Sequence, residues 1–188
     1  ITDIAGAPAS EHSMPDHLYA SGDVLYFSAR GTQDQGRELW MYTSGDGATL
    51  AAHVEGFEDP NESYPKELDP RYMTTFENKL YFACTLLQDA RSEDWELCSL
   101  NPNLPPELSA QLVGVVNQTG DGAVKELTVY DGALYFSGGE GPFVPDHYLY
   151  RYDGLTVTKL DDIVTDDGSG YLPGNLTVYD GDLYFMAA

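Results

Sequence analysis

The tripeptide Leu-Tyr-Phe occurs four times in this chain of 188 residues, at intervals of 49 to 55 residues. The copies occupy residues 25–27, 80–82, 134–136 and 183–185. The hexapeptide Leu-Thr-Val-Tyr-Asp-Gly stands before the last two copies. Asp-Gly between two apolar runs is a strong hairpin signal, because a type I′ turn requires positive φ at both central residues. Each unit is therefore expected to open with two antiparallel strands.

A third and a fourth apolar segment follow in the first three units. The third segments are Glu38-Leu-Trp-Met-Tyr42, Glu96-Leu-Cys-Ser-Leu100 and Tyr148-Leu-Tyr-Arg-Tyr152, and the fourth lie near 50–54, 112–116 and 155–163. Four short strands in about fifty residues are typical of a β-propeller blade. The sequence predicts an all-β, antiparallel, propeller-like domain over 1–188. Its expected units are 5–54, 55–116, 117–163, and 164–188 together with 1–4.

The two ends of the chain suggest a split unit. Ile1-Thr-Asp-Ile4 aligns with the fourth-strand segment 157–163, while the last unit contains only a first and a second strand. Fifteen strands are expected, and a ring of four complete blades has sixteen. Because an unpaired strand edge readily adds another strand, Ile1 and Ile4 are candidate assembly residues. They can complete the last unit within one chain, or they can add to a neighbouring copy.

At 36–40 the sequence Gly-Arg-Glu-Leu-Trp resembles the ELWxxDGT repeat family, whose units run Leu-Tyr-Phe, a loop, Gly-x-Glu-Leu-Trp and Asp-Gly-Thr. Tyr148-Leu-Tyr150 followed by Asp153-Gly-Leu155 is a variant of this pattern. The first unit departs from it by inserting 43–45, and the second places Cys98 where the family has Trp. The resemblance implies propeller-forming pieces of large secreted or surface proteins, with no shared enzymatic activity.

Cys84 and Cys98, the only cysteines, fall on the second and third strands expected in the second unit. A cross-strand disulfide is the favoured interpretation, provided that the strand register brings the two Cβ atoms together. The alternative is a pair of reduced thiols in the core of an intracellular protein.

Two kinds of surface site are also suggested. The N-glycosylation sequons begin at Asn61, Asn117 and Asn175, each in or at the end of the connection that leads into a new unit. Carboxylates at Asp161, Asp162, Asp166 and Asp167 supply oxygen ligands of the kind that calcium prefers. The alternative for these carboxylates is a solvated acidic face without a metal. No cofactor other than a structural calcium ion is expected.

The charge balance limits the partners. Nine Lys and Arg against 31 Asp and Glu give a net charge of −22, which repels nucleic acid and anionic membrane surfaces. No apolar run approaches the roughly 20 residues that span a bilayer. The four histidines lie outside any catalytic motif of known spacing.

These features predict a non-enzymatic extracellular or cell-surface structural protein that self-associates, as a homo-oligomer or as a filament built by head-to-tail strand sharing. A carbohydrate- or calcium-dependent adhesion module with a glycan ligand is the alternative. A propeller enzyme that acts on polysaccharides is the third hypothesis.

Overall fold

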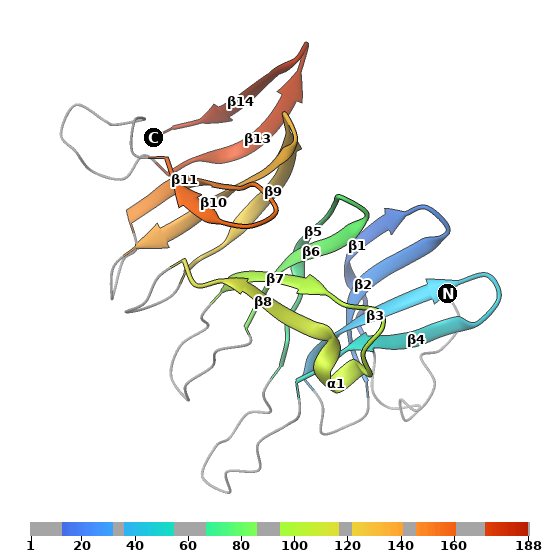
Figure 1. Cartoon of the computed structure of the whole chain (residues 1–188). Coiled ribbons are helices and arrows are strands. Elements are labelled where there is room, and N and C mark those ends of the chain that lie inside the picture. Colours follow the sequence, from blue (N-terminus) through green and yellow to red (C-terminus); the bar gives the residue numbers. More distant parts are fainter. Residues whose placement is uncertain are drawn as a thin grey trace, which may run out of the picture.

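The computed structural model describes residues 13–31, 36–54, 67–85, 95–116, 122–140, 146–160 and 172–187. Its fourteen strands form four antiparallel sheets, each made of strands that are consecutive in the chain (Figure 1). The all-β prediction is confirmed. The strands of the first two sheets are β1 (Asp16–Ser21), β2 (Val24–Arg30), β3 (Arg37–Thr43), β4 (Gly47–Ala52), β5 (Arg71–Phe76), β6 (Lys79–Cys84), β7 (Glu96–Leu100) and β8 (Ala110–Gly114).

The third sheet has the same four-stranded order as the first two, and the fourth consists of one hairpin. Their strands are β9 (Lys125–Tyr130), β10 (Ala133–Glu140), β11 (Asp146–Tyr152), β12 (Val157–Lys159), β13 (Gly174–Tyr179) and β14 (Asp182–Met186). The one helix among the described residues, α1 (Pro106–Ser109), lies between β7 and β8. It packs against β4, where Ser109 Oγ donates to the carbonyl of Ala51 over 2.6 Å.

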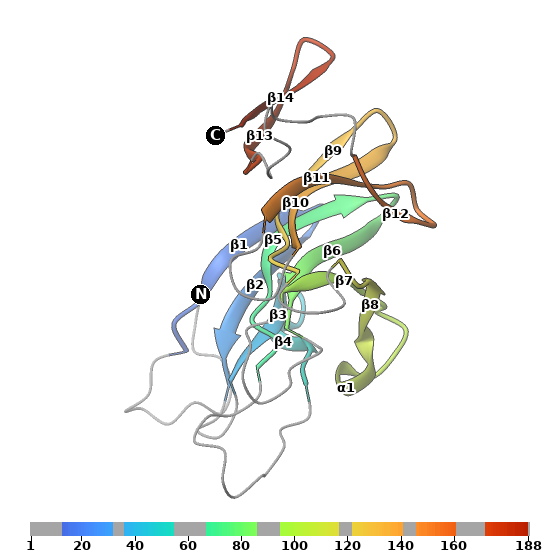
Figure 2. The same cartoon turned by 90° about the vertical axis from the view of Figure 1, so that its left-hand side faces the viewer.

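The first strands of the four sheets lie side by side in the order β1, β5, β9, β13. Between β1 and β5, the N–H of Thr75 donates to the Tyr19 hydroxyl over 2.8 Å. Between β9 and β13, the N–H of Leu176 donates to the Glu126 carboxylate over 3.1 Å. Figures 1 and 2 show the sheets following one another from the N-terminal sheet to the C-terminal hairpin, and the described residues do not close them into a ring.

Every first strand carries the same irregularity near its start. The pairing with the second strand shifts register there, and one residue adopts a left-handed backbone conformation. These residues are His17 (φ 50°), Tyr72 (φ 51°), Glu126 (φ 63°) and Asn175 (φ 55°). Bulges increase the local twist of a strand, so all four units share this bend where they enter the sheet.

The hairpin turns between first and second strands match the sequence prediction in two units. Asp131 and Gly132 have φ of 43° and 67°, and Asp180 and Gly181 have φ of 50° and 87°. Positive φ at both central residues is the condition for a type I′ turn.

The core lies between successive sheets and is built from the Leu-Tyr-Phe strands. Phe27, Phe82, Phe136 and Leu134 are completely buried, and Leu80 is 5% exposed. Leu25, Leu183 and Phe185, which occupy equivalent positions, are only partly buried. The Leu and Phe of the repeated tripeptide are therefore buried in the second and third sheets, and least buried in the hairpin of β13 and β14.

Candidate functional site

The Gly-x-Glu-Leu-Trp segment at 36–40 contacts the chain that leaves the first sheet and the chain that enters the second. A Cβ atom on Gly36 would collide with Glu67, whose Cα would lie only 2.9 Å from it, so only glycine allows this close approach. The Glu38 carboxylate accepts the N–H of Val54, which follows β4, over 3.3 Å. Leu39 is completely buried and Trp40 nearly so. The motif thus holds the exit from the first sheet.

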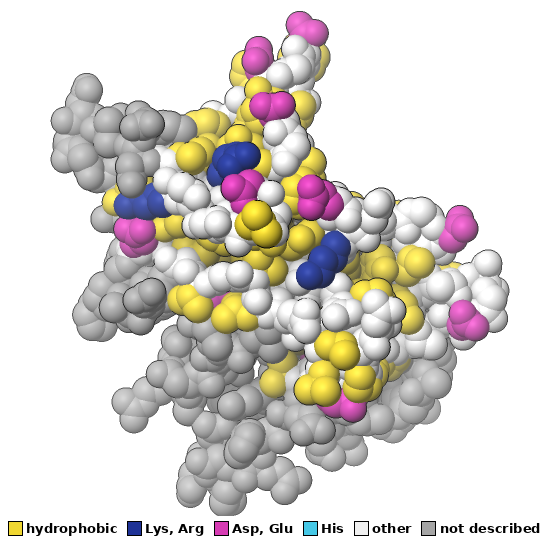
Figure 3. All heavy atoms as spheres, in the orientation of Figure 1, with side chains coloured by type: hydrophobic (Ala, Val, Ile, Leu, Met, Phe, Trp, Pro, Cys, Tyr) yellow, Lys and Arg dark blue, Asp and Glu magenta, His cyan; other side chains and the backbone are white. Residues whose placement is uncertain are grey.

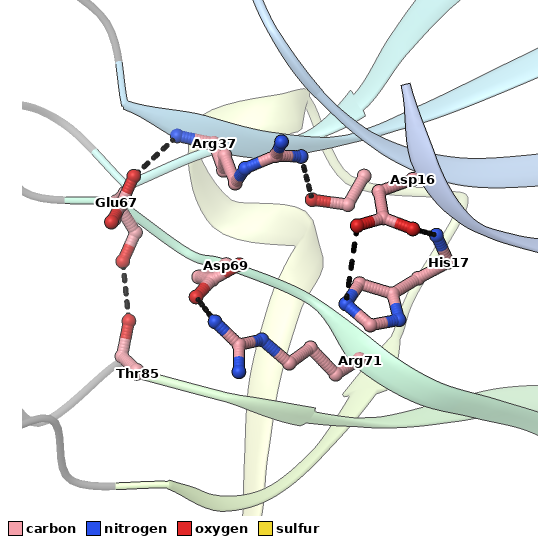
Figure 4. A network of polar contacts seen from close by, with 8 residues as sticks. Asp16, His17, Arg37, Glu67, Asp69, Arg71 and Thr85 are labelled. Carbon is pink, nitrogen blue, oxygen red and sulfur yellow. Dashed lines mark hydrogen bonds and ion pairs between the residues drawn. The ribbon is translucent and has the colours of Figure 1, made fainter. Parts of the chain in front are cut away.

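The segment that enters the second sheet is fixed by polar contacts with the first (Figure 4). The Glu67 carboxylate accepts a hydrogen bond from the backbone N–H of Arg37 over 2.9 Å. The backbone carbonyl of Glu67 accepts a hydrogen bond from the hydroxyl of Thr85. The N–H of Asp69 donates to the carbonyl of Arg37 over 2.9 Å. The connection therefore bridges the start of β3 and the end of β6.

Burial makes Glu38 an unusual carboxyl group. Its pKa is raised from the ordinary 4.5 to about 8, mainly because burial desolvates the carboxylate and to a smaller extent because of the nearby Glu67 charge. The backbone N–H groups of Val54 and Leu68 act in the opposite direction. The side chain is held by backbone donors in the interior, which fits a structural role better than a catalytic one.

The hairpin of β13 and β14 differs from the other three sheets in the pairing and exposure of its strands. Among the described residues, β14 pairs only with β13, whereas the equivalent strands β2, β6 and β10 each pair on both sides. Tyr184 is 53% exposed on β14, while Tyr81 at the equivalent position of β6 is 4% exposed. Figure 3 shows apolar side chains together with acidic ones on this hairpin. Among the described residues, the hairpin thus corresponds to the first two strands of a sheet.

In general, a strand that is paired on one side only can add another β-strand. Backbone N–H and C=O groups along an unpaired strand hydrogen-bond to an added strand, and the side-chain pattern determines its register. Tyr184 and Met186, which is 62% exposed, lie on the same face of β14, because side chains two residues apart in a strand share a face.

The predicted disulfide is confirmed. Cys84 and Cys98 are bonded, with their Cα atoms 5.9 Å apart. Cys98 lies opposite Phe82, and Cys84 lies opposite Glu96, so the bridge runs diagonally between β6 and β7. Both residues are completely buried, and the bond links two central strands of the second sheet.

Most other predicted sites lie outside the described residues. These are Asn61, Asn117, Asp161, Asp162, Asp166, Asp167, Ile1 and Ile4. Asn175 is described: it is exposed near the start of β13, and its side-chain amide contacts Met186 Sδ at 3.0 Å. Its glycosylation stays a prediction.

The described part of the chain contains no cluster of three or more His, Cys, Asp or Glu side chains arranged to hold a metal ion. Calcium binding at the four aspartates stays a prediction. Within the same ranges, no helix has the length and apolar character needed to cross a membrane.

Two structural features were not predicted from the sequence. The left-handed residues of the first-strand bulges are His, Tyr, Glu and Asn, which share no chemical type and only a common place before an apolar residue. The buried carboxylates of Glu38 and Glu96 were placed on the third strands, but their bonds to the following valines depend on tertiary structure. Alignment of the units on Leu-Tyr-Phe is the signal that could have identified both features.

Comparison with family models, curated proteins and solved structures found no match. The resemblance to ELWxxDGT repeats therefore stays a prediction, and the function is inferred from geometry.

Proposed function

We propose that this chain is a non-enzymatic, extracellular structural or interaction protein built of propeller-like β-repeats, and that its copies associate by adding a strand to the open edge of β14. The observation that carries the proposal is the difference between equivalent strands. Tyr184 of β14 is 53% exposed, whereas Tyr81 and Phe82 of β6 are buried between paired neighbours.

The repeated sheets support the propeller-like description. Three sheets have four antiparallel strands in sequence order, and their first strands are adjacent. The same bulge recurs at the start of each first strand. Repeated sheets with one row of innermost strands are the arrangement of propeller blades.

The proposed donor is the segment Ile1 to Ile4 of a second copy. Its alignment with 157–163 indicates a strand-forming sequence. Addition of this segment to β14 joins two different surfaces of the protein, so the contact is heterologous, and a rotation that does not close produces a filament. The alternative is addition of the same segment within its own chain, which would give a closed monomer.

The disulfide favours a location outside the cytoplasm. Disulfides persist in oxidising compartments and are rare in the cytosol of mesophiles, and Cys84 and Cys98 form a buried bridge. The net charge of −22 opposes close association of copies at low ionic strength. Salt screens this repulsion, so assembly should increase with ionic strength.

The direct test removes the donor. The full chain and a variant lacking residues 1–4 are compared by light scattering and electron microscopy at physiological salt. We expect the full chain to form end-to-end oligomers, and the variant to remain a folded monomer that a synthetic peptide of residues 1–12 binds. A full chain that stays monomeric at all concentrations would refute strand sharing. Strand sharing would also be refuted if the full chain forms no polymer and the truncated variant unfolds. That combination supports closure of the segment within its own chain.

A further inference from the structure

A cavity of about 170 Å³ lies where the second sheet meets the third. Arg71 and Tyr72 of β5 and Trp95, just before β7, form one wall. Lys125 of β9 and His147 of β11 form the other, with residues 123 and 124 between them. The cavity is distant in the chain from the β14 edge, and its chemistry is different.

The lining is cationic in a strongly acidic protein. Two of the nine Lys and Arg of the chain line this cavity, together with one of its four His. Arg71 and Lys125 occupy equivalent positions in the repeat, each immediately before the left-handed residue of its bulge. Asp16 and Gly174 hold that position in the first and last units. The bulge is therefore common to all units, whereas the pair of cations belongs to this junction.

Arg71 is held in a fixed position. Its guanidinium lies 4.0 Å from the centre of the Trp95 ring. Its Nη2 donates to Asp69 Oδ2 over 2.5 Å (Figure 4). Asp69 is buried, and the Arg71 side chain is 39% exposed. Arg71 Nε and Asp69 Oδ1 are buried without a hydrogen-bond partner among the described residues. An arginine stacked in this way presents its planar donors with little loss of side-chain entropy.

The net charge of the cavity favours a singly charged anion. Asp69 neutralises Arg71, so Lys125 supplies the surplus positive charge. The surrounding protein is strongly negative and disfavours dianions such as phosphate. A carboxylate is the singly charged group that matches arginine donors in a planar arrangement.

An aromatic side chain completes the cavity wall. Tyr72 is 40% exposed there, and its ring lies 6.4 Å from that of His17 in the neighbouring sheet. The C–H face of a pyranose ring packs on such an aromatic surface through apolar contact. The volume is below the roughly 300 Å³ of a pocket for drug-sized molecules, so it fits a single small unit.

We propose that this cavity binds a single sugar unit that carries one carboxylate, such as glucuronate. The carboxylate lies between Arg71 and Lys125, and the sugar ring packs against Tyr72. The protein thereby recognises a singly charged sugar acid at the junction of the second and third sheets. This binding is independent of strand addition at β14.

The test is titration of the full chain with glucuronate, glucose and inorganic phosphate, followed by calorimetry or by NMR. We expect glucuronate to bind at least about tenfold more tightly than either of the others, since the loss of a charge-assisted contact costs about that factor. Equal binding of glucuronate and glucose would overturn the proposal. Tighter binding of phosphate, or no binding of glucuronate, would do the same.

Three variants locate the site. Lys125→Gln removes the surplus charge from the cavity, and Lys79→Gln makes the same charge change on β6, outside the lining. Glucuronate affinity is expected to fall about tenfold or more in the first variant and to stay unchanged in the second. Equal effects of the two substitutions would show only a general charge effect and would overturn the assignment. Arg71→Lys, which keeps the charge and loses the planar donors, is expected to weaken glucuronate binding as well. Thermal unfolding of each variant confirms that it is folded.

Discussion

Glu38 and Glu96 occupy the same position of successive third strands, and each carboxylate accepts a backbone N–H from the valine two residues beyond the fourth strand of its own sheet. The distances are 3.3 Å from Val54 and 2.6 Å from Val116. Both carboxylates are buried. In both sheets, the pairing of third and fourth strands also shifts register at the residue after the glutamate, at Leu39 and at Leu97. The same hydrogen bond therefore holds the segment that follows the fourth strand in both of these sheets.

The buried Glu38 predicts a pH dependence of stability. Its pKa is about 8 when folded and near the ordinary 4.5 when unfolded. At a pH between these two pKa values, Glu38 is protonated in the folded state and ionised in the unfolded state. The free energy of unfolding therefore falls as pH rises through this interval. The slope reaches at most about 1.4 kcal/mol per pH unit from this group. Urea unfolding of the wild type and of Glu38→Gln between pH 6 and 8 measures it. The variant keeps an oxygen acceptor for Val54 and cannot titrate, so its slope should be smaller. Identical slopes would show that Glu38 is ionised in the folded protein.

The close approach of Gly36 to Glu67 predicts a strong effect of a single methyl group. Gly36→Ala places a Cβ against the backbone of Glu67 and should lower the free energy of unfolding by about 1–3 kcal/mol. Gly45→Ala is the matched control, because nothing lies within 4 Å of a Cβ built there. Its effect should stay within about 0.5 kcal/mol. Equal effects of the two substitutions in chemical denaturation would contradict the close contact.

Equivalent phenylalanines should differ in their contribution to stability. Phe136 is completely buried in the third sheet, and its ring stacks on Tyr150 at 5.6 Å. Phe136→Ala should cost about 3–5 kcal/mol. Phe185, at the same position of β14, is partly exposed, so Phe185→Ala should cost less than half as much in the monomer. A larger cost at Phe185 would mean that the hairpin is packed as fully as the complete sheets.

The disulfide should stabilise the second sheet. The bridge closes a loop with a sequence separation of 14, and a loop of this size predicts a loss of about 3 kcal/mol on reduction. Thermal unfolding with and without reductant measures this loss. The double variant Cys84→Ala, Cys98→Ala should not respond to reductant, and a wild type that is equally unresponsive would show that the bridge contributes nothing.

The local features of the fold could be predicted from the sequence because they depend on short-range patterns. The Asp-Gly turns at 131 and 180, the strand pairs and the proximity of Cys84 to Cys98 follow from alternation and spacing. The count of strands predicts a last unit with only a first and a second strand, and among the described residues β14 pairs only with β13. The cavity was not predicted, because Arg71 and Trp95 meet Lys125 only when the second sheet packs on the third. The left-handed residues were missed since their side chains share no chemistry.

The strand-sharing proposal predicts that charges on β14 prevent assembly, since lysines on an edge strand oppose the addition of another strand. The acceptor variant carries Tyr184→Lys and Met186→Lys, both at exposed positions of β14. The control carries Val178→Lys and Tyr179→Lys, both at exposed positions of β13. β13 is the control strand because it already pairs with β14 on one side and lies beside β9. Both variants change the net charge equally.

The measurement that tests strand sharing most directly is sedimentation velocity of the wild type and these two variants over a range of protein concentrations at physiological salt. We predict concentration-dependent oligomers for the wild type and for the β13 control, and a monomer at every concentration for the β14 variant. A β14 variant that assembles like the wild type, or a wild type that stays monomeric throughout, would contradict assembly through this edge.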